Sequence, residues 1–260
     1  MESNMKALAI FFSEHRGVRW TIQSSMKVLA WFGFFCFEYL AMALLQLSVY
    51  FSNQMRDILL LCGLLLSGFF IYFGMDTLNA SKQSVKGFLK RLSPKNIVWP
   101  TKSEFAYIAA IYIISLAGMM SWQVFENFFL SKITSGTTEN QAALDSMMSF
   151  GGRYSIIVLS LIIVFLGPIM EELVFRGLFF HYFNWKRAPW VTIIASGLLF
   201  GLYHLGSYTW LSLLDLPPYL IIGTGLAYAY SYTNKLSSSI LMHIFHNGWV
   251  QVMSLMVLIH

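Results

Sequence analysis

Long apolar runs separated by short polar segments make up most of this chain. Several runs reach the ~20 residues that a helix needs to cross the hydrocarbon core of a bilayer. The pattern predicts seven spans, at residues 27–51, 57–74, 105–122, 154–175, 190–205, 217–232 and 239–259. An eighth span or a re-entrant segment near residues 211–218 is an open alternative. We therefore expect an all-α polytopic membrane protein with seven to eight transmembrane helices.

The composition supports lipid as the main solvent of this chain. Of its 260 residues, 57% are hydrophobic and only 11% are charged, whereas about a quarter of the residues of an ordinary soluble domain are charged. A soluble globule of this size could not bury so much apolar surface. The sequence thus favours an integral membrane protein, with the lipid bilayer as its first partner.

Basic residues are concentrated in the loop at residues 76–104, which predicts that this loop is cytoplasmic. It carries Lys82, Lys86, Lys90, Arg91, Lys95 and Lys102. Two spans earlier, the N-terminus is then cytoplasmic as well. The net charge of +5 is explained by topology and anionic lipid, so we expect no nucleic-acid partner. Residues 123–153 are predicted to form a flexible external loop.

The front half of the chain offers few chemical signals. Residues 7–12 form a short apolar stretch that indicates an interfacial amphipathic helix rather than a cleaved signal peptide. Cys36 and Cys62 have no metal-like or disulfide-like spacing. Glu38 is an isolated acid in the first span, where it is either a helix contact or part of a substrate groove. Glycines of later spans, including Gly197 and Gly223, predict close helix packing.

The strongest chemical signal is the segment Glu171-Glu172-Leu173-Val174-Phe175-Arg176, at the end of an apolar run. Charged groups at membrane depth are costly and normally mark a function. Glu172 and Arg176 are four residues apart, so they share a helix face and can form an ion pair. Glu171 lies about 100° around the helix without a local partner. A carboxylate in such a setting can act as a general base or acid.

Two later spans carry further polar groups that indicate a shared site. Phe200 and His204 end the fifth span, and His243 and Asn247 lie one helical turn apart in the last span. Together with Glu171, these residues supply a general base, an imidazole to hold a water, and two possible donors for an oxyanion. His246 neighbours them, and we expect it to support the site rather than react.

The three motifs, taken in order, resemble those of the CAAX protease and bacteriocin-processing family, also called the Abi family, which is related to the Ras-converting CAAX endopeptidase. The resemblance covers residues 154–253. It implies that Glu171 and His204 activate a water, that His243 and Asn247 stabilise the oxyanion, and that Glu172 and Arg176 orient the site. It also implies a division into an N-terminal transmembrane region, residues 1–153, and a catalytic region, residues 154–260, with a cavity in that half.

Each of these residues also has a purely structural interpretation. Glu172 and Arg176 could be an ion pair at a helix end, His204 could lie at an interface, and His243 and Asn247 could join helices by hydrogen bonds. All of them occurring together, in family order, favours function. The resemblance implies neither a metal nor another cofactor, although a Glu/His/His set could in principle bind zinc.

The sequence therefore predicts an intramembrane endopeptidase that hydrolyses a peptide bond of a membrane-associated peptide or protein. The alternative is a non-proteolytic immunity or peptide-binding protein on the same scaffold. A transporter is disfavoured, since the charged set has no repeated counterpart in the first half. The short loops are typical of a bacterial member in the cell membrane. The substrate and the oligomeric state are not specified by these patterns.

Overall fold

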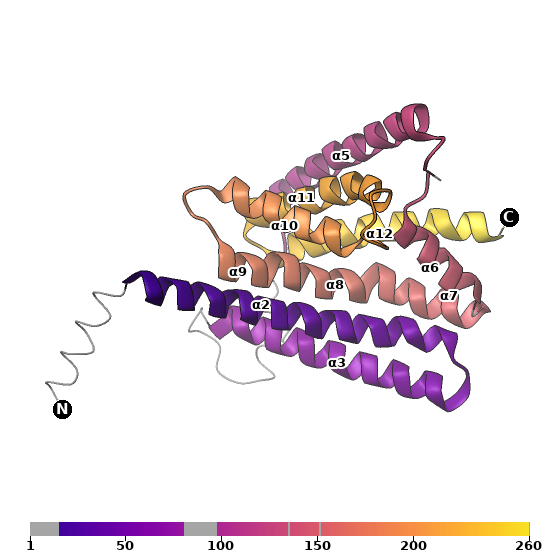
Figure 1. Ribbon diagram of the computed structural model, residues 1–260, viewed down its shortest axis with the longest axis horizontal. Coiled ribbons are helices and arrows are strands. Elements are labelled where there is room, and N and C mark those ends of the chain that lie inside the picture. Colours follow the sequence, from indigo (N-terminus) through magenta and orange to yellow (C-terminus); the bar gives the residue numbers. More distant parts are fainter. Residues whose placement is uncertain (1–15, 81–97, 135, 151, 260) are drawn as a thin grey trace, which may run out of the picture.

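The computed structural model describes residues 16–80, 98–134, 136–150 and 152–259, and these residues form helices, turns and loops without a β-strand. The helices lie side by side in one bundle (Figure 1). In chain order the longer ones are α2 (Arg16–Leu47), α3 (Asn53–Ala80), α5 (Lys102–Phe125), α6 (Glu139–Phe150), α7 (Gly152–Leu161), α10 (Pro189–Tyr203), α11 (Leu216–Thr233) and α12 (Leu236–Ile259). The expected all-α fold is confirmed.

Helices occupy all seven predicted span positions. Five helical runs are long and apolar enough to cross a membrane, namely Gln23–Tyr50, Asn53–Asn79, Lys102–Leu130, Gly152–Phe183 and Leu236–Val257. The two remaining predicted spans correspond to α10 and α11, which have only 15 and 18 residues. Residues 211–218 hold a short 3-10 helix, η6 (Ser212–Asp215), and the start of α11, so the described chain has no eighth span there.

The prediction of a flexible loop at residues 123–153 is wrong for most of its length. Helix α5 continues into a π-helix, η3 (Glu126–Leu130), and α6 follows at Glu139–Phe150. Helix α6 is held by contacts that local sequence does not reveal. Its first backbone N–H, that of Glu139, donates to Asp215 Oδ2 at 2.8 Å, and its Met148 side chain is fully buried. The predicted helix at residues 7–12 and residues 81–97 of the basic loop lie outside the described residues.

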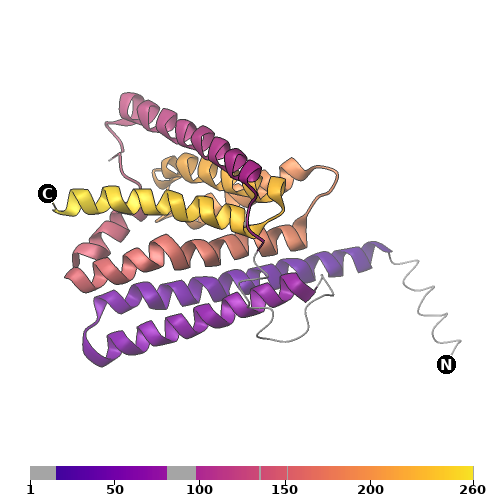
Figure 2. The ribbon, with the colours of Figure 1, turned by 180° about the vertical axis from the view of Figure 1, so that it is seen from behind.

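Helices α2 and α3 form an antiparallel hairpin along one side of the bundle (Figures 1 and 2). Helix α2 lies between α3 and the long helical run that begins at Gly152. The Trp31 indole Nε1–H donates to the Val174 carbonyl at 3.1 Å, and the Trp31 ring packs edge-on against Phe175 and Phe179. The front half of the chain is thus packed directly against the segment that carries the first motif.

Helices α10 and α11 approach each other closely through glycine, as predicted for these residues. A Cβ at Gly197 would lie 2.8 Å from the backbone N of Thr224, and one at Gly223 would lie 3.0 Å from the Gly197 carbonyl oxygen. Both distances are too short for a side chain to fit. This contact brings the C-terminal end of α10, where His204 lies, against the first turns of α11.

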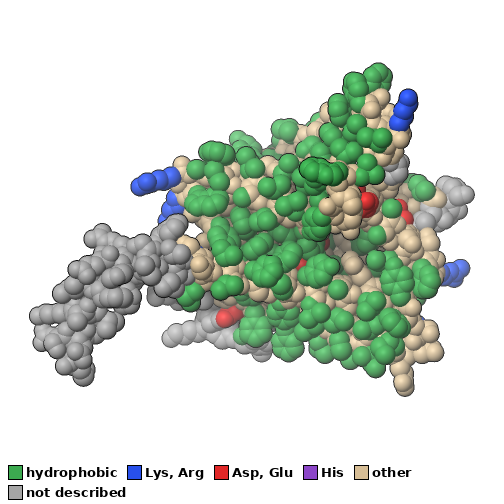
Figure 3. Space-filling view, in the orientation of Figure 1, with side chains coloured by type: hydrophobic (Ala, Val, Ile, Leu, Met, Phe, Trp, Pro, Cys, Tyr) green, Lys and Arg blue, Asp and Glu red, His purple; other side chains and the backbone are tan. Residues whose placement is uncertain are grey.

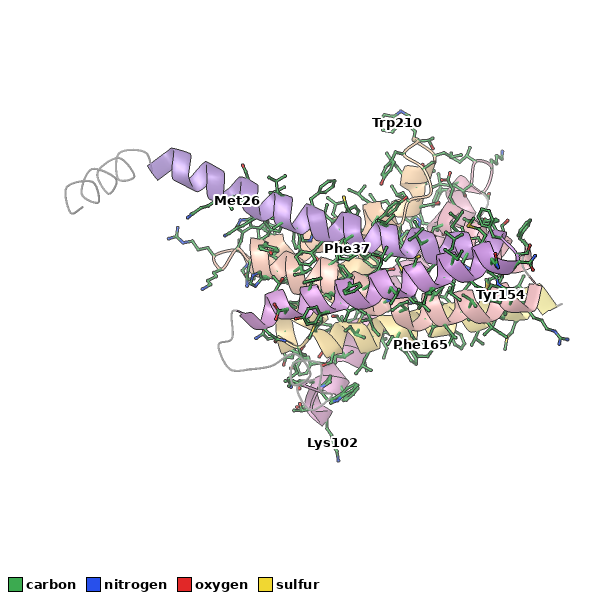
Figure 4. The ribbon with its side chains drawn as sticks, turned by 90° about the horizontal axis from the view of Figure 1, so that it is seen from below. Met26, Phe37, Lys102, Tyr154, Phe165 and Trp210 are labelled. Carbon is green, nitrogen blue, oxygen red and sulfur yellow. The ribbon has the colours of Figure 1, made fainter. Side chains whose placement is uncertain are left out.

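The outer surface is that of a protein embedded in lipid. Hydrophobic side chains cover most of the face in Figure 3, and the blue Lys and Arg side chains lie toward its edges. Trp210, which is 89% exposed, projects from the loop after α10, and Lys102 projects at the start of α5 (Figure 4). Both positions agree with an apolar belt bounded by aromatic and basic residues.

Candidate active site

The first motif lies within a helical run that is interrupted twice by π-helical turns. The run comprises α7, the π-helix η4 (Ile162–Leu166), α8 (Gly167–Glu172), the π-helix η5 (Leu173–Leu178) and α9 (Phe179–Phe183). Glu171 and Glu172 therefore end a short α-helical piece between two π-helices. Such π-helical turns occur frequently at functional sites.

Pro168 gives a physical reason for the distortion in η4. Proline has no N–H, and its ring clashes with the carbonyl four residues earlier in a regular helix. In the π register the N–H of residue 168 would reach the Ile163 carbonyl, and proline cannot supply it. The Asn247 side chain does so instead, since its Nδ2–H donates to the Ile163 oxygen at 2.9 Å.

Glu172, Arg176 and His243 are buried and joined by hydrogen bonds through Glu172, and they are here called the buried network. Glu172 Oε1 accepts hydrogen bonds from Arg176 Nη1 at 2.8 Å and from His243 Nδ1 at 2.9 Å. Arg176 Nη2 donates to the Gly223 carbonyl of α11 at 2.8 Å. The Arg176 guanidinium also lies over the Phe200 ring, 4.5 Å from its centroid. The predicted pair on one helix face is confirmed, and it joins three helical segments.

Glu171 differs from its neighbour because, among the described residues, its ion-pair contacts are with histidines and not with a Lys or Arg. Its Oε2 lies 3.6 Å from His204 Nε2 and 3.7 Å from His243 Nε2. These separations are longer than a direct hydrogen bond, and Glu171 Oε2 has no hydrogen-bond partner among the described residues. The three groups face one point, where a single water could bridge them.

The partners of the two imidazoles fix their tautomers in the same sense. His204 Nδ1 lies 2.9 Å from the Phe200 carbonyl, which can only accept, so Nδ1 carries the proton. His243 Nδ1 donates to Glu172 in the same way. In the neutral form of each ring, Nε2 has a free lone pair, and this atom lies 3.6 Å (His204) or 3.7 Å (His243) from Glu171 Oε2. His204 of the second motif and His243 of the third motif thus meet the first motif at Glu171.

Asn247 and His246 lie near this group but make contacts elsewhere. As predicted, Asn247 is one turn from His243, yet its recorded hydrogen bond goes to Ile163 rather than to Glu171 or His204. His246 Nδ1 lies 3.5 Å from the Tyr112 hydroxyl of α5. The motifs therefore predict the Glu171, His204 and His243 cluster, whereas Asn247 and His246 border it.

Three further residues contact the site that the motifs did not single out. The Tyr203 hydroxyl donates to Glu38 Oε1 at 3.1 Å, and Glu38 is fully buried. The Tyr219 ring stacks on the His204 ring, with centroids 5.0 Å apart and planes at 24°. Aromatic residues are abundant in this chain, so neither tyrosine stands out in the sequence. The lone acid in the first span was the one available signal for Glu38.

A second polar group lies at the end of α10, and is here called the surface network. The Tyr219 hydroxyl and Thr138 Oγ1 are 2.7 Å apart, Ser207 Oγ donates to Glu139 Oε2 at 2.8 Å, and Asp215 accepts from the Glu139 backbone N–H. Partial burial raises the pKa of the Asp215 carboxyl, this hydrogen bond opposes the rise, and the Glu139 carboxylate adds to it. The network ties α6 to the loop that follows His204.

Two other features of the described residues bear on the site. A pocket of about 410 Å³ opens near the α2–α3 turn, and none of the candidate residues lines it. Its walls are Val49, Tyr50, Phe51, Ser52, Arg56, Phe150 and Tyr154. Within the described part of the chain, no group of three or more His, Cys, Asp or Glu side chains is arranged to hold a metal ion.

Fold and site together define an all-α integral membrane protein with a buried carboxylate and imidazole centre. Residues 153–249 match the family model described as type II CAAX prenyl endopeptidase Rce1-like. This match contains the Glu171, His204 and His243 cluster and Asn247, and it confirms the resemblance to CAAX proteases for this part of the chain.

The chain is also similar to individual proteins at modest identity. The chain is 28% identical over 159 residues to the UPF0177 protein YxdF of Lactococcus lactis, covering 61% of this chain and 77% of that protein. It is 32% identical over 119 residues to YbdI of the same organism, covering 46% and 60%. It is 26% identical over 174 residues to the membrane-embedded CAAX protease MroQ of Staphylococcus aureus, covering 65% and 67%. No solved structure matches significantly.

Proposed function

We propose that this chain is an intramembrane endopeptidase that hydrolyses a peptide bond of a membrane-associated peptide or protein. The observation that carries the proposal is Glu171, a buried carboxylate with no charged partner, whose Oε2 faces the Nε2 atoms of two histidines. A structural carboxylate at membrane depth would be expected to have a partner, as Glu172 has. The family match over residues 153–249 supports the same class of activity.

In the proposed reaction, a water lies between Glu171 and His204. Glu171 accepts a proton from this water as it attacks the peptide carbonyl carbon, while the lone pair of His204 Nε2 orients its second proton. The C–N bond of the resulting tetrahedral intermediate then breaks, and Glu171 returns the proton to the departing amine. General acid–base transfer of this kind contributes about 10²–10⁴-fold to a rate.

The oxyanion would be stabilised from the α12 side of the site. His243 Nδ1 donates to the Glu172 carboxylate, and a His243 ring that has already taken up a proton from solvent at Nε2 can donate this N–H to the oxyanion. Asn247 uses one of its two amide protons on Ile163 and keeps the other. One donor of this kind is typically worth ~10²–10³ in rate.

The proposed substrate is a small membrane-associated peptide, such as a pheromone or bacteriocin precursor, in a bacterial cell membrane. One relative is named as a membrane-embedded CAAX protease, which supports a substrate held at the membrane. A non-proteolytic immunity or peptide-binding role on this scaffold is the second candidate. The position of Glu171 Oε2, which faces the Nε2 atoms of two histidines, favours cleavage, because binding alone does not require this arrangement.

The test compares cells that carry the wild-type chain with cells that carry Glu171→Gln at matched membrane abundance. Peptide termini in membranes and medium are catalogued by mass spectrometry. Glu126→Gln is the matched control, since Glu126 is also a buried acid, 7% exposed as Glu171 is, and lies away from the site in η3.

We expect a set of termini that is present with the wild type and Glu126→Gln and absent with Glu171→Gln. These termini would also identify candidate substrates. Identical catalogues for all three forms, together with rescue of a deletion phenotype by Glu171→Gln, would contradict proteolysis and support the binding role.

A further inference from the structure

A buried acid in the front half of the chain lies beside the candidate active site. Glu38 is in the middle of α2, and its side chain is fully buried in a predominantly apolar environment. Burying a carboxylate in such surroundings is costly, so its retention calls for a role. Its Oε1 accepts a hydrogen bond from the Tyr203 hydroxyl at 3.1 Å, and its Oε2 has no hydrogen-bond partner among the described residues.

The packing of α2 places Glu38 at the level of Glu171. The two helical segments run antiparallel, with Trp31 bonded to the Val174 carbonyl and Met42 packed near Gly167. Glu38 lies between Trp31 and Met42, as Glu171 lies between Val174 and Gly167. A Cβ at Gly167 would be 3.4 Å from Met42 Cε and 3.5 Å from Glu171 Oε1, so α2 and Glu171 border the same space.

Tyr203 connects this acid to the imidazole of the site. Helix α10 ends at Tyr203, and His204 is its C-cap, followed by a loop. The last residues of a helix lack part of its hydrogen bonding and fray unless other contacts hold them. The Tyr203 ring packs edge-on against His204, with centroids 5.2 Å apart, and edge-on against Phe35, and it makes a tilted contact with Phe175. The hydrogen bond that the Tyr203 hydroxyl donates to Glu38 fixes the far end of this ring.

We propose that Glu38 is a positioning residue of the active site, which holds Tyr203 and thereby sets the place of His204 relative to Glu171. The effect of Glu38 on cleavage rests on the proposed function, whereas its effect on the position of His204 does not. It assigns part of the site to α2, which lies outside the residues matched by the family model. The front half of the chain then contributes a residue to the active site, in addition to packing against the helices that carry the motifs.

The experiment uses the full chain in membranes and four variants: Glu38→Leu, Glu38→Gln, Tyr203→Phe, and the double variant Glu38→Leu with Tyr203→Phe. Glutamine keeps an oxygen that can accept from Tyr203, whereas leucine keeps similar volume without an acceptor. Three quantities are measured. The turnover number and KM are determined for a synthetic peptide that spans a Glu171-dependent cleavage site, and the rate at which diethyl pyrocarbonate modifies His204 is read by mass spectrometry. His243, which is more deeply buried, serves as the internal reference.

We expect Glu38→Leu and Tyr203→Phe each to lower the turnover number by roughly tenfold with little change in KM, since small displacements of a reacting group cost up to about 10²-fold. The double variant should lose no more than either single one, because one linkage is broken. Glu38→Gln should stay near wild type. The His204 modification rate should change severalfold in the same three variants and be restored in Glu38→Gln.

Loss of activity in Glu38→Gln would overturn positioning, because the carboxylate charge itself would then be required. Unchanged His204 reactivity in Glu38→Leu, or additive losses in the double variant, would overturn it as well. The modification rate does not depend on catalysis. If no Glu171-dependent cleavage exists, the proposed function fails while the His204 reactivities still decide the placement by Glu38.

Discussion

The buried network includes His243 and the surface network contacts His204, and both histidines face Glu171. The two networks differ in how far water can reach them. In the buried network, Glu172 and Arg176 are fully inaccessible, and His243 is held through them. In the surface network, the bonds of Glu139 to Ser207 and Asp215 are exposed, and His204 is contacted only through the ring of Tyr219. We therefore expect the position of His243 to be more tightly fixed than that of His204.

This difference follows from the cost of removing charge from water. A buried ion pair is costly to form, and breaking it by removing one partner is worse, because the other charge is left without compensation. An exposed pair loses little, since water replaces the missing partner. Substitutions in the buried network should therefore act first on folding, and substitutions in the surface network should act first on the placement of His204.

Arg176→Ala is expected to have the largest effect. It leaves the buried Glu172 carboxylate with its hydrogen bond from His243 but without its arginine partner and frees the Gly223 carbonyl, and losing one partner of a buried pair costs about 3–5 kcal/mol. Thermal unfolding in detergent and membrane abundance should both fall, and cleavage with them. Lys235→Ala is the control, because it removes the Lys235–Glu104 pair near the surface. Equal stability of the two variants would refute the contrast between buried and exposed pairs.

Asn247→Ala should have the second-largest effect, and it separates two roles of one side chain. The variant removes the donor to the half-buried Ile163 carbonyl, and leaving an acceptor without a partner costs up to about 1–3 kcal/mol. Adding Pro168→Ala restores an N–H at residue 168, which can reach this carbonyl from within the helix. We expect the double variant to regain part of the stability, measured by thermal unfolding.

The activity of the same double variant then tests the oxyanion role of Asn247. If Asn247 only supports η4, cleavage should recover together with stability. If its second amide proton also stabilises the oxyanion, cleavage should stay low in a protein of restored stability. A double variant as unstable as Asn247→Ala would show instead that Pro168 does not explain the unpaired Ile163 carbonyl.

The sequence predicts the positions of the helices and the pairing within the first motif well, because both depend on local spacing. The Glu172–Arg176 pair follows from a separation of four residues on one helix, and the helix positions follow from runs of apolar residues. Other features depend on contacts between distant segments. The fold of α6 depends on Asp215, and the approach of Glu38 to Tyr203 requires the register of α2 against the motif helix. No local pattern in one sequence specifies such pairings.

The π-helices show the same limit on a smaller scale. Pro168 predicts a distortion of its helix, but the residue that donates to the Ile163 carbonyl in its place, Asn247, is distant in sequence. Likewise, the motif spacing places His243 and Asn247 on one face, yet only the packing shows that His243 faces Glu171 while Asn247 bonds Ile163. The meeting of these residues was thus predictable, whereas the individual contacts that each side chain makes were not.

The smallest effects are expected at Tyr219, where the surface network touches the site. Tyr219→Phe keeps the ring that stacks on His204 and loses the hydroxyl bonds to Thr138 and Asn140, so stability should fall by only about 0.5–1.5 kcal/mol. Tyr219→Leu also removes the stacked ring, and cleavage should then fall severalfold further at similar membrane abundance. Comparing the two variants isolates the ring from its hydroxyl, because both lose the same hydrogen bonds. Equal cleavage by Tyr219→Phe and Tyr219→Leu would mean that the Phe200 carbonyl and Tyr203 suffice to place His204, and that the surface network serves only to hold α6.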